Sequence, residues 1–240
     1  MDALTRDRLR QWAEEYHNER FITGDPVQFP HRYRRKQDIE VSGLLTAILS
    51  FGSRTQILKK ADELDCLMGG SPWQYVLSRR WDTDFPSTRR DSFYRMLSHA
   101  AFRTYFERLH DAYTRHSSLE EALLSCPGTP MERLCAFLGV SSASPQKKLN
   151  MFLRWMIRPQ GPVDFGIWQS FSPSELLIPL DTHVCRIACD LGLIPKPTFS
   201  LRNARLITEA LAEVFPEDPC LGDFALFGYG VSHTGKKGAV

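Results

Sequence analysis

Apolar residues recur every three or four positions along most of the chain, a spacing that gathers them on one face of an α-helix. A first helix is expected to begin near Thr5, and its apolar face consists of Leu9, Trp12, Ala13 and Tyr16. No segment shows convincing strand alternation. Leucine outnumbers valine and isoleucine combined, although β-branched residues fit pleated surfaces best. The pattern therefore predicts an all-α fold.

Two helices joined by a tight turn are predicted after a basic and aromatic connector, residues 29–36. Asp38 is expected to cap the first helix. Its buried positions are Ile39, Leu44, Leu45, Ile48 and Leu49. After Gly52 and Ser53, the second helix presents Ile57, Leu58, Ala61 and Leu64. The tight junction between these helices is a place where the backbone could approach a ligand.

The most one-sided distribution of charge lies between Glu132 and Asp164, because residues 133–163 include no acidic residue. Five basic residues fall in this window: Arg133, Lys147, Lys148, Arg154 and Arg158. A helix beginning near Pro145 would bury Leu149, Phe152, Leu153 and Met156 and carry a cationic stripe on another face. That stripe is either an ordinary solvated face or a surface for phosphate groups.

Lys147 and Lys148 occupy the first turn of this helix, where the positive end of the helix dipole disfavours an ammonium group. A lysine so placed and partly desolvated is a candidate amine nucleophile that could form a Schiff base with a sugar carbon. The simpler interpretation is that both lysines are exposed.

A further helix is predicted to start at residues 181–182 and to end at Gly192, with Asp181 or Thr182 as its cap. As a cap, Asp181 would only satisfy free amide groups at the helix start. As a functional group, a carboxylate held there could stabilise positive charge that develops on a sugar during cleavage of a glycosidic bond. Both interpretations remain open on the residues alone.

Other candidate sites are weaker. His183, Cys185 and Cys189 lie close together in the sequence, but a fourth ligand with familiar spacing is missing, so no metal site is expected. Gly-rich phosphate loops and the Gly-x-Ser-x-Gly elbow are absent from the sequence, which argues against those enzyme classes. Aromatic residues at 165–168 and 224–229 favour core packing, or stacking on an extruded base with Trp168 as the preferred candidate.

Composition narrows the class of protein. The longest apolar run is residues 134–138, far short of the roughly 18 residues of a membrane span, and residues 1–7 do not resemble a secretion signal. We therefore expect a cytoplasmic protein with no membrane association and with its six cysteines as thiols. The formal net charge of +2 does not exclude nucleic acid as a partner, because a local basic stripe matters more than the total.

Several segments taken together resemble an uncharacterised bacterial family, which in turn resembles the helix-hairpin-helix DNA glycosylases. In layout it is most similar to the archaeal-type 8-oxoguanine DNA glycosylases. The matching segments are residues 25–33, 147–158, 163–168, 179–184 and 223–228. The resemblance implies a two-lobed all-α fold with a central cleft. Residues 38–160 would form a helical-barrel lobe that ends in the hairpin and the lysine helix, and residues 1–37 with 161–240 would form the second lobe.

The resemblance also implies an activity, a DNA-repair glycosylase with β-lyase activity that flips out and excises an oxidised purine. Lys147 would be the nucleophile and Asp181 its electrostatic partner, with Lys148 as the alternative nucleophile. The expected partner is double-stranded DNA with a damaged base, bound by a monomer without cofactor. The four closely spaced cysteines of relatives with an iron–sulfur cluster are missing.

The remaining site residues combine the basic and aromatic segments described above with the junction at residues 51–54, which the resemblance places beside the extruded base. Contacts to the extruded base are expected from Trp168, Phe165, Gly52, Arg54 and His183. Contacts to the DNA backbone are expected from Arg154, Arg158, Ser142, Ser144, Arg34 and Arg35, and Lys148 would contact a phosphate if it is not the nucleophile. The alternatives are a non-catalytic nucleic-acid-binding protein that keeps this fold, and a helical interaction or metal-binding protein.

Overall fold

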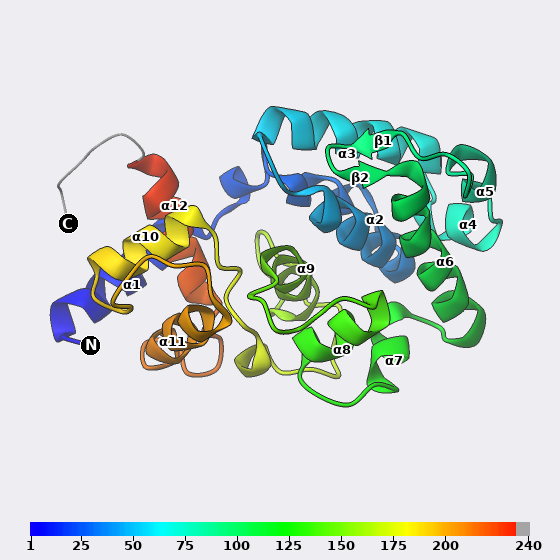
Figure 1. Ribbon diagram of the computed structural model, residues 1–240. Helices are drawn as coiled ribbons and strands as arrows, with labels where there is room; N and C mark the ends of the chain where they lie inside the picture. Colours follow the sequence, from blue (N-terminus) through cyan, green and yellow to red (C-terminus); the bar gives the residue numbers. More distant parts are fainter. Residues whose placement is uncertain (234–240) are drawn as a thin grey trace. The chain divides into compact units, whose positions relative to one another are not determined.

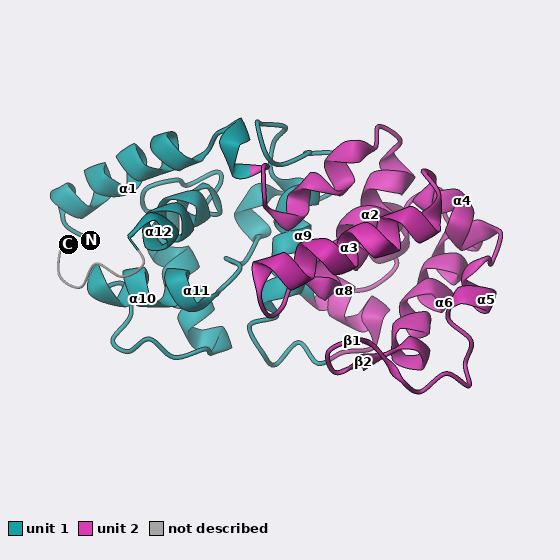
Figure 2. Ribbon diagram, turned by 90° about the horizontal axis from the view of Figure 1, so that it is seen from above, with its two compact units in different colours: residues 1–21, 129–131, 141–240 teal, residues 22–128, 132–140 magenta. Residues whose placement is uncertain are grey.

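The computed structural model describes residues 1–233, which are predominantly helical, as expected (Figure 1). Contacts between backbone positions divide the chain into two compact units (Figure 2). Unit 1 contains residues 1–21, 129–131 and the described residues from 141 onward, and unit 2 contains residues 22–128 and 132–140. Helix α8 (Pro130–Leu138) has its first two residues in unit 1 and the rest in unit 2.

Unit 1 contains five α-helices and two 3-10 turns among the described residues. They are α1 (Ala3–Tyr16), η1 (Glu19–Phe21), α9 (Lys147–Ile157), η4 (Pro173–Glu175), α10 (Thr182–Asp190), α11 (Leu201–Ala212) and α12 (Leu221–Ser232). Trp12 of α1 stacks on Tyr229 of α12 with ring centroids 3.9 Å apart. Gly228 permits this close packing, because a Cβ atom there would lie 2.3 Å from the ring of Tyr16.

The structure assigns α9 differently from the predicted division at residues 38–160. This helix belongs to unit 1, so Lys147 and Asp181 lie in the same unit. The segment that follows α9 is hydrogen-bonded to the last turn of that helix. The backbone nitrogens of Phe165 and Trp168 donate hydrogen bonds to the carbonyl oxygens of Trp155 and Met156, at 2.8 and 3.0 Å. Because these bonds are local, α9 and residues 163–168 form one packed element.

Unit 2 is built around α2 (Lys36–Leu49), whose residues 38–49 are all buried. Its other elements are η2 (Pro26–Gln28), η3 (Pro30–Arg32), α3 (Arg54–Met68), α4 (Pro72–Leu77), α5 (Trp81–Asp84), β1 (Ser92–Tyr94), β2 (Leu97–Ser98), α6 (His99–Arg115) and α7 (Leu119–Leu124). The expected pair of helices with a tight junction is therefore present as α2 and α3. The N-cap of α3 is Ser53, whose side chain accepts a hydrogen bond from the Gln56 backbone.

Two sequence expectations need correction in unit 2. Helix α2 begins before Asp38, and the carboxylate of Asp38 accepts hydrogen bonds from the Trp73 backbone nitrogen and the Ser71 hydroxyl group, at 2.9 and 3.3 Å. It therefore joins α2 to the start of α4 and does not cap α2. The antiparallel strands β1 and β2 were also not expected, because segments of three and two residues are too short to show alternation.

No helix in the part of the chain that the structure describes has the length and apolar character needed to cross a membrane.

Candidate functional site

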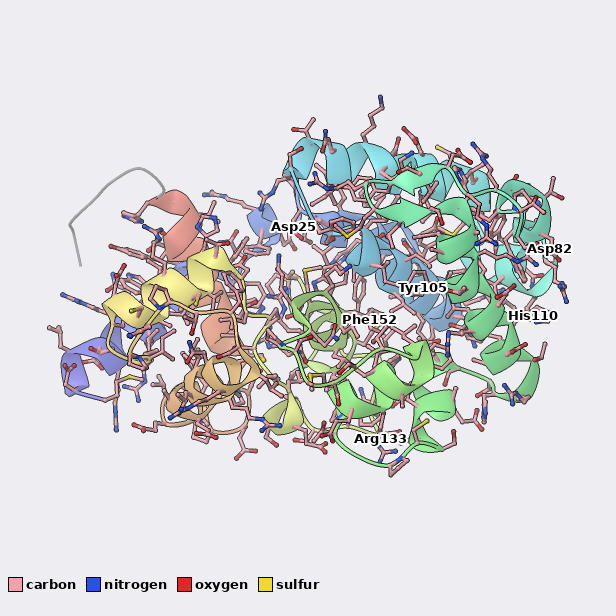
Figure 3. The ribbon with its side chains drawn as sticks, viewed as in Figure 1. Asp25, Asp82, Tyr105, His110, Arg133 and Phe152 are labelled. Carbon is pink, nitrogen blue, oxygen red and sulfur yellow. The ribbon has the colours of Figure 1, made fainter. Side chains whose placement is uncertain are left out.

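Lys147 is the first residue of α9, the helix that carries the labelled side chain of Phe152 in Figure 3. The preceding residue, Gln146, has the left-handed backbone angles φ 42° and ψ 49°, and its side chain does not cap the helix. The left-handed region is unusual for a residue other than glycine, and such residues are frequent at functional sites. The side chain of Lys147 is 38% exposed, so its amine is accessible to solvent.

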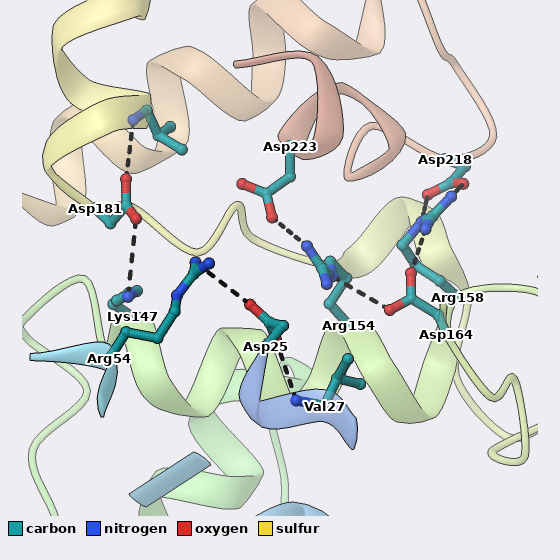
Figure 4. A network of polar contacts seen from close by, with 11 residues as sticks. Asp25, Val27, Arg54, Lys147, Arg154, Arg158, Asp164, Asp181, Asp218 and Asp223 are labelled. Carbon is teal, nitrogen blue, oxygen red and sulfur yellow. Dashed lines mark hydrogen bonds and ion pairs between the residues drawn. The ribbon is translucent and has the colours of Figure 1, made fainter. Parts of the chain in front are cut away.

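Asp181 is the N-cap of α10, as one of the two predicted alternatives required. Its Oδ1 atom accepts a hydrogen bond from the backbone nitrogen of Val184 at 2.9 Å. The other carboxylate oxygen, Oδ2, lies 3.8 Å from Nζ of Lys147 (Figure 4). The cap and the ion pair thus use different oxygens, and the hydrogen bond to Val184 fixes the direction in which the second oxygen faces.

The geometry gives this pair a definite chemical capacity. Only 12% of the Asp181 side chain is exposed, and the carboxylate is held rigidly beside a more accessible amine. A primary amine is a nucleophile for carbon in its neutral form, and an adjacent carboxylate can stabilise a cation that develops near it. The two sequence-predicted catalytic residues are therefore in contact.

Lys148 differs from Lys147 in its environment. Burial lowers the pKa of the Lys148 ammonium group, and the positive charge of Lys147 acts in the same direction. Burial disfavours the charged form because the ammonium group loses hydration. Lys147 forms an ion pair with Asp181, and burial favours the neutral amine at Lys148, so both lysines remain candidate nucleophiles.

Arg154 and Arg158 are not available to phosphate groups, and the expectation that they contact DNA is wrong. Their side chains are only 4% and 3% exposed. Arg154 pairs with Asp164 and Asp223, and Arg158 pairs with Asp164 and forms a bidentate contact with Asp218 (Figure 4). Both guanidinium groups also lie over the ring of Phe224, 4.4 and 5.1 Å from its centroid. They join α9 to the start of α12.

The aspartates of this network are the residues that sequence reasoning missed. Burial raises the pKa of Asp223 to about 6, although Arg154 acts in the opposite direction. Asp164 and Asp223 stand within two of the segments that carry the family resemblance, which is the only signal that could have marked them. Asp218 lies outside those segments and had no such signal.

Trp168 packs in the interior, so the expectation that it stacks on an extruded base is wrong. It is 1% exposed, and its ring lies edge-on to Phe152 with centroids 5.4 Å apart. Its neighbour Phe165 is half-buried and remains a candidate contact residue. The core interpretation of Trp168 was the alternative that the sequence left open.

Three other predicted site residues belong to unit 1. His183 lies in the first turn of α10, two residues after Asp181, is half-buried, and places its ring edge-on to Phe227 at 5.9 Å. Ser142 and Ser144 lie in the segment before α9, where Ser142 is half-buried and Ser144 is exposed. The contact of His183 with an extruded base, and the contacts of Ser142 and Ser144 with the DNA backbone, stay predictions.

The other four predicted site residues belong to unit 2. Gly52 and Arg54 form the junction between α2 and α3, and the guanidinium group of Arg54 lies 3.8 Å from Asp25. Arg34 and Arg35 are both exposed at the start of α2, and the guanidinium carbon of Arg35 lies 5.1 Å from the Trp73 ring centroid. The DNA contacts expected of these four residues stay predictions.

The cysteines near His183 take structural positions. Cys185 is buried, and its thiol group donates a hydrogen bond to the carbonyl oxygen of Thr198 at 3.6 Å. Within residues 1–233, no three side chains from His, Cys, Asp and Glu gather in a way that could hold a metal ion.

Comparison with known proteins gives a family assignment. A family model described as "Protein of unknown function (DUF2400)" matches residues 25–138 and 131–232, which include both Lys147 and Asp181. No curated protein and no solved structure matches the chain. Since the matched residues make up most of its length, the chain belongs to the DUF2400 family.

Proposed function

We propose that this protein is a DNA-repair glycosylase with β-lyase activity that excises an oxidised purine similar to 8-oxoguanine. The observation that carries the proposal is the contact between Nζ of Lys147 and Oδ2 of Asp181, 3.8 Å apart at the starts of two helices. The proposal includes a fold of the helix-hairpin-helix glycosylase type and double-stranded DNA as the partner. The sequence motifs support the proposal through the family resemblance, and the Lys147–Asp181 pair supports it through the chemistry that its two groups can perform.

In the first step, the neutral amine of Lys147 forms a bond to C1′ of the damaged nucleotide. The bond between C1′ and the base nitrogen breaks, and its electron pair leaves with the base, which takes up a proton. The nitrogen of Lys147 loses a proton, the C1′–O4′ bond breaks as O4′ takes up a proton, and the open sugar is joined to Nζ by a protonated imine at C1′. Removal of a proton from C2′ then expels the 3′ phosphate group, which breaks the C3′–O bond and nicks the strand.

Asp181 acts in this scheme through its charge. A carboxylate beside the amine stabilises positive charge on the sugar while the base departs. Because the hydrogen bond with the Val184 backbone holds the other oxygen, the carboxylate needs little reorganisation when that charge develops. The buried pairs of Arg154 and Arg158 support the same site by holding α9, the helix that begins with Lys147.

A covalent trapping experiment tests this function. The full chain is incubated with a panel of duplexes that each carry one oxidised purine, an abasic site or no lesion, in the presence of sodium borohydride. Borohydride delivers hydride to C1′ of the imine and converts it into a stable secondary amine. The proposal predicts a protein–DNA complex that survives denaturation with at least one oxidised purine, and excised base in the absence of borohydride.

Two results separate this function from the non-catalytic alternative. A protein that only binds nucleic acid would retain the duplexes in a salt-dependent manner and form no covalent complex with any lesion. Trapping on the abasic duplex without excision of any base would restrict the activity to the lyase step and would contradict the glycosylase assignment.

A further inference from the structure

A pocket of about 320 Å³ lies in unit 2 between α3 and the β1–β2 hairpin. Gln56, Lys59 and Lys60 line it from α3, and Phe93 and Arg95 line it from the hairpin. None of these residues was singled out by the sequence patterns. The pocket is therefore a feature that the Lys147 site does not use.

Positive charge dominates this pocket. Lys60 pairs with the pocket's carboxylate, Glu63. Lys59 is exposed, and neither Lys59 nor Arg95 forms an ion pair with any carboxylate in residues 1–233. Two cations thus remain without an anionic partner from the described chain. Such an arrangement favours an anionic ligand.

The aromatic residues of the pocket exclude one kind of ligand contact. Phe93 and Tyr94 are buried, and Nζ of Lys60 lies over the Phe93 ring, 4.7 Å from its centroid. The Tyr94 hydroxyl group donates a hydrogen bond to the carbonyl oxygen of Phe51 at 2.7 Å. Stacking of a base requires an open ring face, and both rings are already covered. The pocket therefore suits phosphate oxygens better than a nucleobase.

The tip of the hairpin holds Arg95 in an unusual backbone conformation. Tyr94 pairs with Leu97, so Arg95 and Met96 form a two-residue turn. Arg95 has φ 52°, a value that favours glycine, asparagine or aspartate at this position of such turns. Met96, which follows it, is 83% exposed. Glycine would adopt this conformation with less strain, so the presence of arginine here points to a role for its side chain.

The Arg95 side chain is directed by its neighbours towards the junction of α2 and α3. Its Nη1 atom lies 3.5 Å from Oε1 of Gln56, and its guanidinium carbon lies 5.8 Å from the Phe51 ring centroid. A Cβ atom on Gly52 would come within 2.6 Å of Nη1. Gly52 therefore permits the guanidinium group to occupy this place.

We propose that this pocket binds phosphate groups of a DNA strand, with Arg95 and Lys59 as the contacting cations. The assignment rests on the proposed function and extends it. It identifies a surface in unit 2 that contacts the DNA backbone, a role that the buried Arg154 and Arg158 cannot fill. Free nucleotides carry the same phosphate chemistry, so the test includes them.

Binding of a fluorescently labelled, lesion-free duplex at several salt concentrations tests the proposal. The variants are Arg95→Gly, which suits the left-handed turn and keeps the hairpin, and Lys59→Gln. Each is expected to weaken binding severalfold at 0.1 M salt and to lower the slope of log K against log salt by about 0.9, the value for one lost phosphate contact. Arg115→Gln is the control, since it removes an exposed arginine at the far end of α6, about 24 Å along that helix from the hairpin.

The outcomes are distinct. Unchanged affinity and salt slope in Arg95→Gly, or an equal loss in Arg115→Gln, would overturn the proposal. If ATP competes with duplex DNA for the wild-type protein and Arg95→Gly loses ATP binding alone, the pocket is a nucleotide site and the DNA assignment is wrong. The binding measurement uses a duplex without a lesion, so its outcome does not depend on whether the protein excises a base. Normal borohydride trapping by Arg95→Gly together with an unchanged salt slope would reject the phosphate-binding role of the pocket and leave the proposed glycosylase function intact.

Discussion

The Nζ atom of Lys147 lies 3.8 Å from Oδ2 of Asp181, and each residue stands at the beginning of its helix. Asp181 also caps α10 through its other oxygen, which accepts a hydrogen bond from Val184. The cap makes the position of the carboxylate a property of the local fold. The structural and the functional interpretations of Asp181 are therefore compatible, and variants can separate them.

Asp181→Asn should remove the charge and keep the cap. Asparagine and aspartate are nearly equivalent as N-caps, so the free energy of unfolding should change by less than about 0.5 kcal/mol. Loss of the carboxylate should slow base excision by roughly 10²- to 10³-fold. Urea denaturation and single-turnover excision measure the two effects.

Asp181→Ala provides the comparison, because alanine also removes the cap and should cost about 1 kcal/mol of stability. An Asp181→Asn protein that excises the base at the wild-type rate would exclude an electrostatic role for this residue.

Arg154→Met should destabilise the protein by roughly 3–5 kcal/mol, because it removes the ion-pair partner of the buried Asp223 carboxylate and leaves the buried Asp164 carboxylate with Arg158 alone. The methionine side chain keeps part of the volume, so the main loss is electrostatic. Arg205→Gln, an exposed arginine on α11, should change stability by less than about 0.5 kcal/mol. Urea denaturation of both variants measures the difference. Equal stabilities would contradict a structural role for Arg154.

Tyr113→Phe tests a buried pair in unit 2. The Tyr113 hydroxyl group donates a hydrogen bond to Glu40 at 2.9 Å, and Glu40 also accepts from the backbone nitrogen of Leu119. Removal of the hydroxyl group leaves Glu40 with one donor fewer, so the variant should be less stable by about 1–3 kcal/mol at pH 8.

The same pair should make stability depend on alkaline pH. Burial raises the pKa of Tyr113 well above 10, and the charge of Glu40 adds to the increase. Above pH 10 the unfolded chain releases this proton while the folded chain keeps it, so the stabilising contribution of Tyr113 falls with increasing pH. The stability gap between wild type and Tyr113→Phe should narrow by up to about 1.4 kcal/mol per pH unit above 10. Denaturation curves that keep a constant gap from pH 9 to 11 would contradict this assignment.

The sequence predicts the features of this protein that depend on local periodicity. The apolar spacing predicted the first helix, the pair α2 and α3 and the helix that begins at Lys147, since most of the apolar positions that it placed in the core are buried there. The cap at Asp181 was also predictable, because a helix start needs an acceptor for its free amide groups. Local chemistry decides these features, so neighbouring residues carry the signal.

Long-range pairing decided the features that the sequence did not reveal. Arg158 meets Asp218 across 60 positions, and Arg154 meets Asp223 across 69, so their cationic stripe resembled a solvent-facing surface. The choice between Lys147 and Lys148 as nucleophile stays a prediction, because the ion pair shows only that Lys147 lies beside the Asp181 carboxylate. The position of Arg95 at the tip of a turn depends on the β1–β2 hairpin, which is too short to produce a pattern in the sequence.

Identification of the residue that carries the trapped sugar tests the central claim most directly. The borohydride-reduced complex with an oxidised-purine duplex is digested with nuclease and protease, and mass spectrometry locates the sugar remnant. We predict the adduct on Lys147, with no complex from Lys147→Ala and trapping retained in Lys148→Ala. An adduct on Lys148 or on any other amine, or undiminished trapping by Lys147→Ala, would contradict the role of the Lys147–Asp181 pair.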